Sequence, residues 1–256
     1  MAVNNQQHLL HFNTIKLKNM AIIINGLLSG KLGNNIYFIR NKKNYVRSAY
    51  QRKERAVSNP RNILFSRAAR MCRSLRQQIL PVINLPKGNV MYTSLMSSLL
   101  KWIRFADNPL LNKNEQLHCF DNCTFTAGNH LRNTWHIPVK VRRVSKGLVQ
   151  LKIPACIPEL HIKAPACTVF VECKIVVAGS LASDGSATGS CSASLSLDYN
   201  GKRVPEKIIK MNMPAPKGAL IVTAMSLEYT TCKNGLMEKC TDKKFMPAGV
   251  VRVLYV

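Results

Sequence analysis

The feature that most constrains the fold is an alternation of residue types in the second half of the chain. From Val169 to Val177 every second residue is apolar, and from Ser190 to Asp198 every second residue is a serine or an aspartate. Successive side chains of a strand point to opposite faces, so this pattern is typical of half-buried antiparallel strands. The two stretches therefore predict long strands with one face in a core.

Further short stretches have a similar character. They lie at residues 149–153, 208–213, 219–229 and 250–256, and turn-forming residues such as Ser183-Asp184-Gly185 and Asn200-Gly201 separate them from their neighbours. Six or more strands at this spacing indicate a β-sandwich.

Two helices are predicted before these strands. Asn59 can cap a helix that begins at Pro60, and Pro81 ends it. A second helix is expected from residue 89 to residue 105. In the first helix an apolar stripe recurs at steps of three and four residues, opposite a row of arginines. The stripe contains Leu64, Ala68, Met71, Leu75 and Ile79.

A hairpin is predicted before the helices. Asn35, Tyr37 and Ile39 fall on one face of an extended stretch, Ile36, Phe38 and Arg40 fall on the other, and residues 41–44 offer a turn before Tyr45. We therefore expect an α+β fold, with an N-terminal β-hairpin plus two helices followed by a C-terminal antiparallel β-sandwich-like domain. The expected division is a flexible extension at 1–19, a basic hairpin and helical region at 20–115, and the sandwich-like domain at 120–256. Met20 is an alternative start.

Positive charge is concentrated in the same region. The chain carries 37 Lys and Arg against 12 Asp and Glu, a net charge of +25. Residues 31–76 hold thirteen of the basic residues and one acid, Glu54. Such a footprint favours a polyanionic partner, although a solvated basic face would have the same composition.

Aromatic residues are interleaved with these cations, which is typical of surfaces that stack nucleobases while cations follow phosphates. We expect Tyr37 and Tyr45 to stack bases. The predicted phosphate contacts are Arg40, Lys42, Lys43, Arg47, Arg52, Lys53, Arg55, Arg67, Arg70, Arg73 and Arg76.

The glycines near residue 30 do not form a nucleotide-binding loop. A phosphate loop needs four residues between its glycines and a Ser or Thr after the lysine, whereas here three residues separate Gly26 from Gly30 and Leu32 follows Lys31. We expect Gly26, Gly30 and Gly33 to provide the positive φ angles that lead into a strand.

A zinc site is a further alternative. Cys119, Cys123, His130 and His136 have suitable ligand types, but six residues separate the cysteine pair from the histidines, half the gap of a usual zinc finger. The sequence leaves this alternative open, because ordinary residues between two domains would have the same composition.

No enzyme is predicted. The acids are scattered without paired spacing, and no nucleophile motif appears. We expect no cofactor. Nine cysteines without a signal peptide predict free thiols in a cytoplasmic protein with no membrane contact.

The segments SGKLGN, FIRNKKNYVRS, LRQQILPVI and KFMPAGVV resemble those of a family of small basic Bacteroidota proteins with no assigned activity. The resemblance covers residues 20–256. It implies a cytoplasmic protein with a β-rich C-terminal half, and it implies no function.

Two functions are consistent with these features. The first is a non-enzymatic basic protein that binds nucleic acid or a nucleoprotein assembly through residues 31–76. The second is a structural or adaptor protein whose β-sandwich mediates protein contacts while the basic arm docks on an acidic partner. The sequence does not decide between DNA, RNA and an acidic protein surface as the partner.

Overall fold

The computed structural model describes residues 22–24, 26–48, 59–83, 85, 89–106, 115–145 and 147–256. The expected α+β class is confirmed, because helices and three antiparallel sheets are present together. The chain forms two compact units, Met1–Val57 and Ser58–Val256. Each unit is described by itself.

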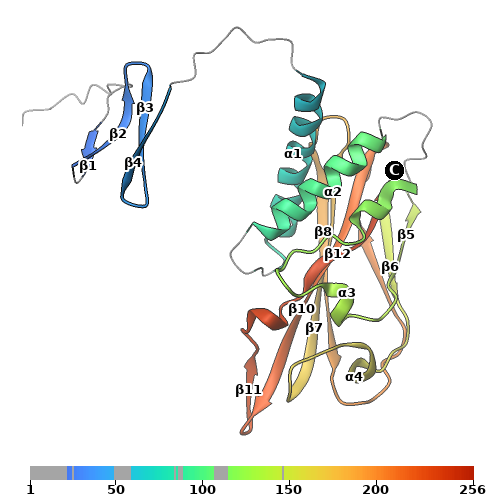
Figure 1. Ribbon diagram of the computed structural model, residues 1–256. Coiled ribbons are helices and arrows are strands. Elements are labelled where there is room, and N and C mark those ends of the chain that lie inside the picture. Colours follow the sequence, from blue (N-terminus) through green and yellow to red (C-terminus); the bar gives the residue numbers. More distant parts are fainter. Residues whose placement is uncertain are drawn as a thin grey trace, which may run out of the picture. The chain divides into compact units, whose positions relative to one another are not determined.

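The first unit is a four-stranded antiparallel sheet in chain order (Figure 1). Its strands are β1 (Ile22–Ile24), β2 (Leu27–Leu32), β3 (Asn35–Arg40) and β4 (Lys43–Ser48). The predicted hairpin corresponds to β3 and β4, whereas β1 and β2 extend it by two strands that the sequence pattern did not indicate. None of the side chains described in this sheet is buried.

The turn between β3 and β4 is tighter than predicted. Arg40 pairs directly with Lys43, so the loop is only Asn41 and Lys42, with φ angles of 51° and 57°. Two consecutive residues with positive φ form a type I′ turn, whose twist suits a two-residue hairpin. Asparagine tolerates this conformation, and Lys42 adopts it without the usual glycine.

A side-chain clip joins β2 to β4. The Asn44 amide is oriented so that its nitrogen donates to the carbonyl oxygen of Leu28 at 3.1 Å and its oxygen accepts from the Leu28 amide at 3.2 Å. Gly30 lies within β2 with a φ of 119°, which only glycine adopts readily. The clip therefore joins β4 to the first half of β2, which pairs with β1 and not with β3.

The second unit begins with the two predicted helices, α1 (Pro60–Ile79) and α2 (Val90–Ala106). The side chain of Asn59 accepts a hydrogen bond from the Arg61 amide at 3.0 Å, which confirms the predicted cap. Four residues of the predicted stripe are fully buried: Ala68, Met71, Leu75 and Ile79.

Five strands form the central sheet of this unit. They are β7 (Thr168–Leu181), β8 (Ala187–Asp198), β10 (Ala219–Lys233), β11 (Leu236–Lys239) and β12 (Ala248–Tyr255). β7 pairs with β8 on one side and β10 on the other. The far side of β10 is shared, because β12 pairs with its first half and β11 with its last residues.

A smaller sheet has the order β5-β6-β9, with β5 (Lys140–Ser145), β6 (Leu148–Ile153) and β9 (Lys207–Asn212). Short helical turns connect the elements: η1 (Glu115–Phe120), α3 (Leu131–Thr134), α4 (Pro158–His161) and η2 (Lys243–Phe245). The predicted strands at 149–153, 208–213, 219–229 and 250–256 correspond to β6, β9, β10 and β12.

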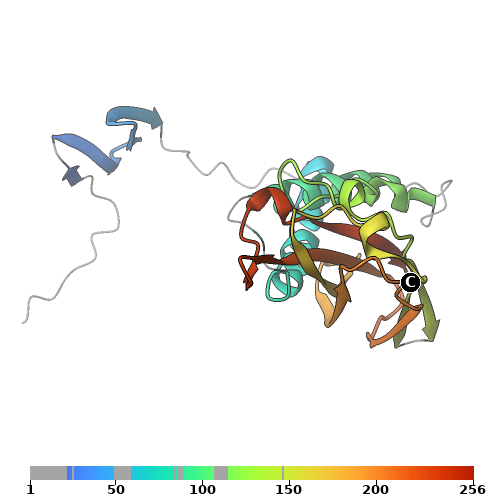
Figure 2. The same cartoon turned by 90° about the horizontal axis from the view of Figure 1, so that it is seen from below.

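The central sheet separates two hydrophobic cores. Val176, Ala178 and Val222 pack against the helices, whereas Ile175, Val177 and Ile221 pack against the smaller sheet. Neighbours in a strand thus face opposite layers. Figure 2 shows α2 on one side of the long strands and the β5-β6 hairpin on the other. The two packed sheets confirm the sandwich-like arrangement expected for the C-terminal half.

The compact unit begins earlier in the chain than the division near residue 115 to 120 that the change of pattern indicated. Met71, Leu75, Leu99 and Trp102 lie fully buried in one core with strands of the central sheet. The helices and the sheet are therefore parts of a single packed unit that starts at Ser58. Of the helices that the structure describes, none combines the length and apolar character needed to cross a membrane.

Candidate nucleic-acid interface

The strand register collects the cations of the first sheet on one face. In β3 and β4, Ile36 lies opposite Arg47, Phe38 opposite Tyr45 and Arg40 opposite Lys43. Directly opposed residues project from the same face of a sheet. Lys31 of β2 joins them, because it lies opposite Ile36. We call this surface the basic aromatic face, and its members are Lys31, Ile36, Phe38, Arg40, Lys43, Tyr45 and Arg47.

Two stacked rings occupy the centre of the basic aromatic face. The ring centroids of Phe38 and Tyr45 are 5.6 Å apart and the ring planes are inclined by 18°. The guanidinium carbon of Arg47 lies 6.0 Å from the Phe38 centroid, within the range of a cation–π contact. Phe38 is 39% exposed and Tyr45 is 43% exposed. The stack is therefore open to a planar ligand and is bordered by positive charge.

The opposite face of β3 and β4 is uncharged. Tyr37 lies opposite Val46, and Ile39 lies opposite Asn44. Tyr37 is half-buried on this face, away from the cations with which the sequence analysis grouped it. The ring that does accompany Tyr45 belongs to Phe38. The alternation of residues 35–40 already placed Phe38 on the same face as Arg40. That pattern is the sequence signal that could have identified Phe38 as the aromatic residue beside the cations.

The predicted phosphate contacts of the first unit are distributed as follows. Arg40, Lys43 and Arg47 belong to the basic aromatic face, and Lys42 occupies the turn beside it. Arg52, Lys53 and Arg55 lie outside the described residues.

The arginines of α1 differ from one another. The Arg67 guanidinium donates a hydrogen bond to the carbonyl oxygen of Ala182, so this side chain fastens the helix to the turn after β7. Arg70 and Arg73 are exposed, and Arg76 is half-buried. A groove of about 510 Å³ runs beside Arg73 and Arg76, with the Tyr92 ring of α2 in its wall. Arg70, Arg73 and Arg76 therefore face solvent or a groove, whereas Arg67 has a structural partner.

The zinc alternative receives no support from the geometry. Cys119, Cys123, His130 and His136 all belong to the described part of the chain, within which no three His, Cys, Asp or Glu side chains are arranged to hold a metal ion. The Cys123 sulfur accepts a hydrogen bond from the Ser94 hydroxyl at 3.4 Å instead.

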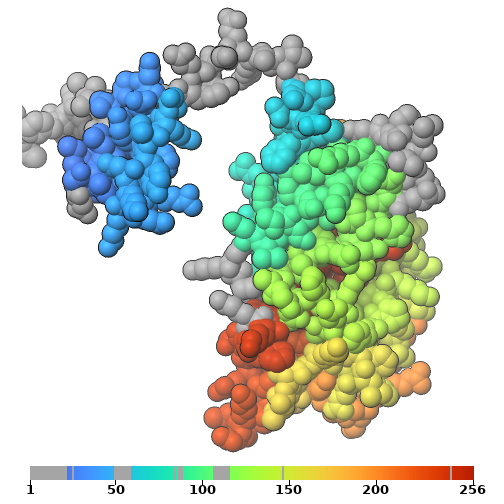
Figure 3. All heavy atoms as spheres, viewed as in Figure 1, coloured from blue at the N-terminus to red at the C-terminus, as the bar shows by residue number. Residues whose placement is uncertain are grey.

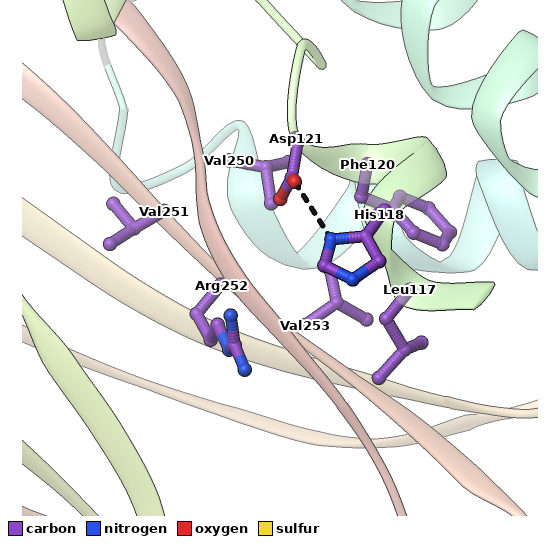
Figure 4. A pocket seen from close by; sticks show the side chains of 8 residues that line it. All are labelled: Leu117, His118, Phe120, Asp121, Val250, Val251, Arg252 and Val253. Atoms are coloured by element: carbon purple, nitrogen blue, oxygen red, sulfur yellow. Dashed lines mark hydrogen bonds and ion pairs between the residues drawn. The ribbon is translucent and has the colours of Figure 1, made fainter. Parts of the chain in front are cut away.

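A small polar site lies next to η1. His118 Nδ1 is 3.1 Å from Asp121 Oδ2, and Arg132 Nη2 is 3.2 Å from Asp121 Oδ1. Figure 4 shows the His118 imidazole turned toward Asp121 beside the strand β12. In Figure 3 the red atoms of this strand are visible in a hollow among green atoms. The cavity is lined by Leu117, His118, Phe120, Asp121, Val250, Val251, Arg252 and Val253.

The cavity beside this histidine–aspartate pair offers no hydroxyl or thiol nucleophile. The cavity holds about 50 Å³, enough for one or two water molecules, and none of its lining residues is a serine, threonine or cysteine. Burial raises the pKa of the nearby thiols of Cys119 and Cys123 to about 11. A thiol with so high a pKa is almost fully protonated at neutral pH and is a poor nucleophile.

All nine cysteines are free thiols. No protein-family model matches the chain, and no curated protein is significantly similar to it. The resemblance to the Bacteroidota family therefore stays an expectation from the sequence.

Proposed function

We propose that the protein binds nucleic acid, without a chemical step, and that the basic aromatic face makes the principal contact with unpaired bases. The observation that carries this proposal is the exposed Phe38–Tyr45 stack, which shares one sheet face with four cations. Aromatic rings stack on bases of any sequence, and neighbouring cations neutralise the phosphates. The expected ligand is a single strand, because a duplex keeps its base faces covered.

The exposed arginines of α1 provide a second source of affinity in this proposal. Among the described residues, Arg73 and Arg76 form no ion pair with a carboxylate. Lysine and arginine side chains without such partners release counterions when they contact phosphates. They contribute affinity without sequence preference.

An adaptor function is the second candidate, and one observation favours it. Apolar side chains of the first unit are exposed, among them Ile23, Leu32 and Val46. Exposed apolar clusters of this kind mark protein contact sites as well as loosely packed small domains. An adaptor predicts one tight protein partner and weak retention on polyanions.

The salt dependence of binding tests the first proposal. Affinity for labelled single-stranded DNA and RNA of mixed sequence is measured by fluorescence anisotropy at several salt concentrations from about 50 to 200 mM. The test variant carries Lys31→Gln, Arg40→Gln and Lys43→Gln, which keep the ring stack and Arg47. Each lost phosphate contact makes the slope of log affinity against log salt shallower by about 0.7 for a single strand.

The matched control removes the same charge elsewhere. It carries Lys207→Gln, Lys210→Gln and Lys217→Gln, three exposed positions in or near β9. If the control loses as much affinity and slope as the test variant, binding is diffuse and the basic aromatic face has no special role. If wild type does not bind at about 50 mM salt, where phosphate contacts are strongest, the nucleic-acid proposal fails and the adaptor remains.

A further inference from the structure

The strand β8 is an edge of the central sheet. It pairs with β7 from Phe170–Asp198 to Val177–Cys191 without a break, and a register shift occurs only near its first residues. No described strand is hydrogen-bonded to its other side. An edge strand presents a row of unpaired backbone N–H and C=O groups that can bind another strand.

β8 differs from the other edge strands of the unit in its charge. From Ala187 to Leu197 it contains no charged residue and no proline. Natural proteins usually protect an edge with lysine, other charges or proline. The edges formed by β5, β9, β11 and β12 each carry at least one lysine or arginine. β8 is the one edge in the described sheets of this unit without a lysine or arginine, and its single charge is Asp198 at its last position.

The two faces of β8 would match those of a second strand that also has one polar and one apolar face. Its serines are exposed on one face, whereas Cys191, Ala193 and Leu195 on the other face are only half-buried and lie at the rim of the core. The exposed serines are Ser190, Ser192, Ser194 and Ser196. A strand added beside β8 would complete the burial of the apolar side chains, and the small serine side chains would not obstruct its approach.

We propose that two copies of this chain associate through their β8 edges, antiparallel and related by a two-fold axis perpendicular to the sheet. Such an axis keeps each face continuous, so serine lies opposite serine and apolar residue opposite apolar residue. The two central sheets then form one ten-stranded sheet. Pairing over the regular part of β8 makes about eight to ten backbone hydrogen bonds.

Charge favours a second copy over an unrelated acidic segment. The chain carries +25, so two copies repel each other over most of their surfaces. The uncharged edge of β8 is where this repulsion is smallest at close approach. An acidic peptide would find no lysine or arginine within β8 to pair with, whereas an uncharged strand of identical sequence is self-complementary.

Sedimentation of the full chain tests this proposal. The protein is treated with nuclease and studied at high salt, so that nucleic acid cannot bridge two copies. Wild type is expected to sediment with twice the mass of the 28.6 kDa chain. Ser192→Lys should raise the dimer dissociation constant at least about tenfold, because it places a lysine from each copy within the paired edge. Ser183→Lys adds the same charge in the exposed turn after β7 and should leave the dimer intact.

A second variant separates loss of the dimer from loss of the fold. Ser196 lies opposite Glu172 on β7, so Ser196→Lys adds a favourable cross-strand pair within one copy and still places a charge on the edge. It should therefore be monomeric and still melt in one cooperative transition. A monomeric wild type at concentrations up to about 100 μM overturns the proposal, since stable self-association would be detected there. A dimer that survives both edge lysines overturns it as well.

Discussion

The aromatic rings of Phe38 and Tyr45 lie opposite each other on neighbouring strands and stack with 5.6 Å between their centroids. A cross-strand aromatic pair stabilises a hairpin by about 0.2 to 1 kcal/mol. That contribution matters in a sheet whose described side chains are never buried. The same exposure leaves the pair accessible to a planar ligand, so one contact serves both the folding of the hairpin and the proposed binding.

Replacing single rings distinguishes the two faces of this sheet. Tyr45→Ala should weaken binding of a single strand by about 1 to 3 kcal/mol for each base stacked, with little change in the salt slope. Tyr37→Ala removes a similar ring from the uncharged face and should leave affinity unchanged. Anisotropy titrations of both variants measure the effect, and circular dichroism checks that each remains folded. Equal losses in the two variants would show that the basic aromatic face is not the binding surface.

The α1 arginines should separate into a structural and a surface group. Arg67→Gln removes the hydrogen bond from the guanidinium to the Ala182 carbonyl and should lower the free energy of unfolding by about 1.5 to 3 kcal/mol. Arg73→Gln lies on the exposed side and should change it by less than about 0.5 kcal/mol. Urea unfolding measures both values. A stability loss at Arg73 as large as that at Arg67 would contradict this division.

The turn after β7 depends on glycine at position 185. A Cβ atom there would lie 2.7 Å from the Met71 amide nitrogen of α1, and φ is 80°. Gly185→Ala should cost about 2 to 4 kcal/mol, the sum of left-handed strain and a clash between packed segments. Gly235→Ala has nearly the same φ, 79°, with open space around the new atom, and should cost only about 1 to 2 kcal/mol. Thermal melts of the two variants compare the costs, and equal values would remove the clash as the cause.

A fragment of residues 120–256 should fail to fold as a stable unit, although the strand pattern alone favours its independence. Val176, Ala178, Leu220 and Val222 face the helices in the intact chain. Without α1 and α2 their side chains are exposed as a contiguous apolar surface, which costs about 25 cal/mol for each Å² uncovered. Near-UV circular dichroism and urea titration of the fragment test this expectation. A cooperative unfolding transition in the isolated fragment would contradict it.

Stability should fall at alkaline pH because of buried thiols. Burial raises the pKa of Cys72 and of Cys123 from an ordinary value of 9.0 to about 11, so the folded state favours the protonated thiol. The contribution of these protonated thiols to the free energy of unfolding is fully present below about pH 9. It is lost as the pH rises from 9 toward 11, because the unfolded chain then releases protons that the folded chain retains. Each such thiol contributes roughly 2 kcal/mol of this loss.

Urea unfolding in a reducing buffer at pH 8 and at alkaline pH measures how the free energy of unfolding changes with pH. Because lysines and tyrosines also titrate there, the informative quantity is the difference between wild type and Cys72→Ala. The variant should lose less stability than wild type between the two conditions. Cys167→Ala, at an exposed position, serves as the control. If the slope of Cys72→Ala equals that of wild type, this thiol does not titrate as described.

Local patterns predicted those elements whose neighbours in sequence determine them. Helix α1 follows from the Asn59 cap, the Pro60 start and the apolar stripe, and β7 and β8 follow from strict alternation. Contacts between distant segments were not predictable in the same way. The covering of β7 by α1 depends on small residues such as Ala178, which fit beneath a helix but produce no signal of their own.

The candidate site was also predicted only in part, because its local pattern was visible in the sequence and its cross-strand pairs were not. Alternation within residues 35–40 is enough to place Phe38 beside Arg40. Assigning their partners on β4 requires the length of the turn, and a two-residue turn in place of the expected four sets the pairs that are observed. The positive φ angle of Gly30 was expected, but its place inside β2 was not, because a glycine in a strand is compatible with several local geometries.

The sharing of β10 between two cores has a consequence for motion. Ile221 and Met225 pack in one core, and Val222 and Ala224 pack in the other, while β7 and β12 hold the backbone from both sides. Neither the helices nor the smaller sheet can separate from the central sheet without a movement of β10. Such a movement disturbs the neighbouring residues of β10, which pack in the other core. The amide hydrogens of these residues should exchange with deuterium only when the whole unit opens, and at one common rate for both faces.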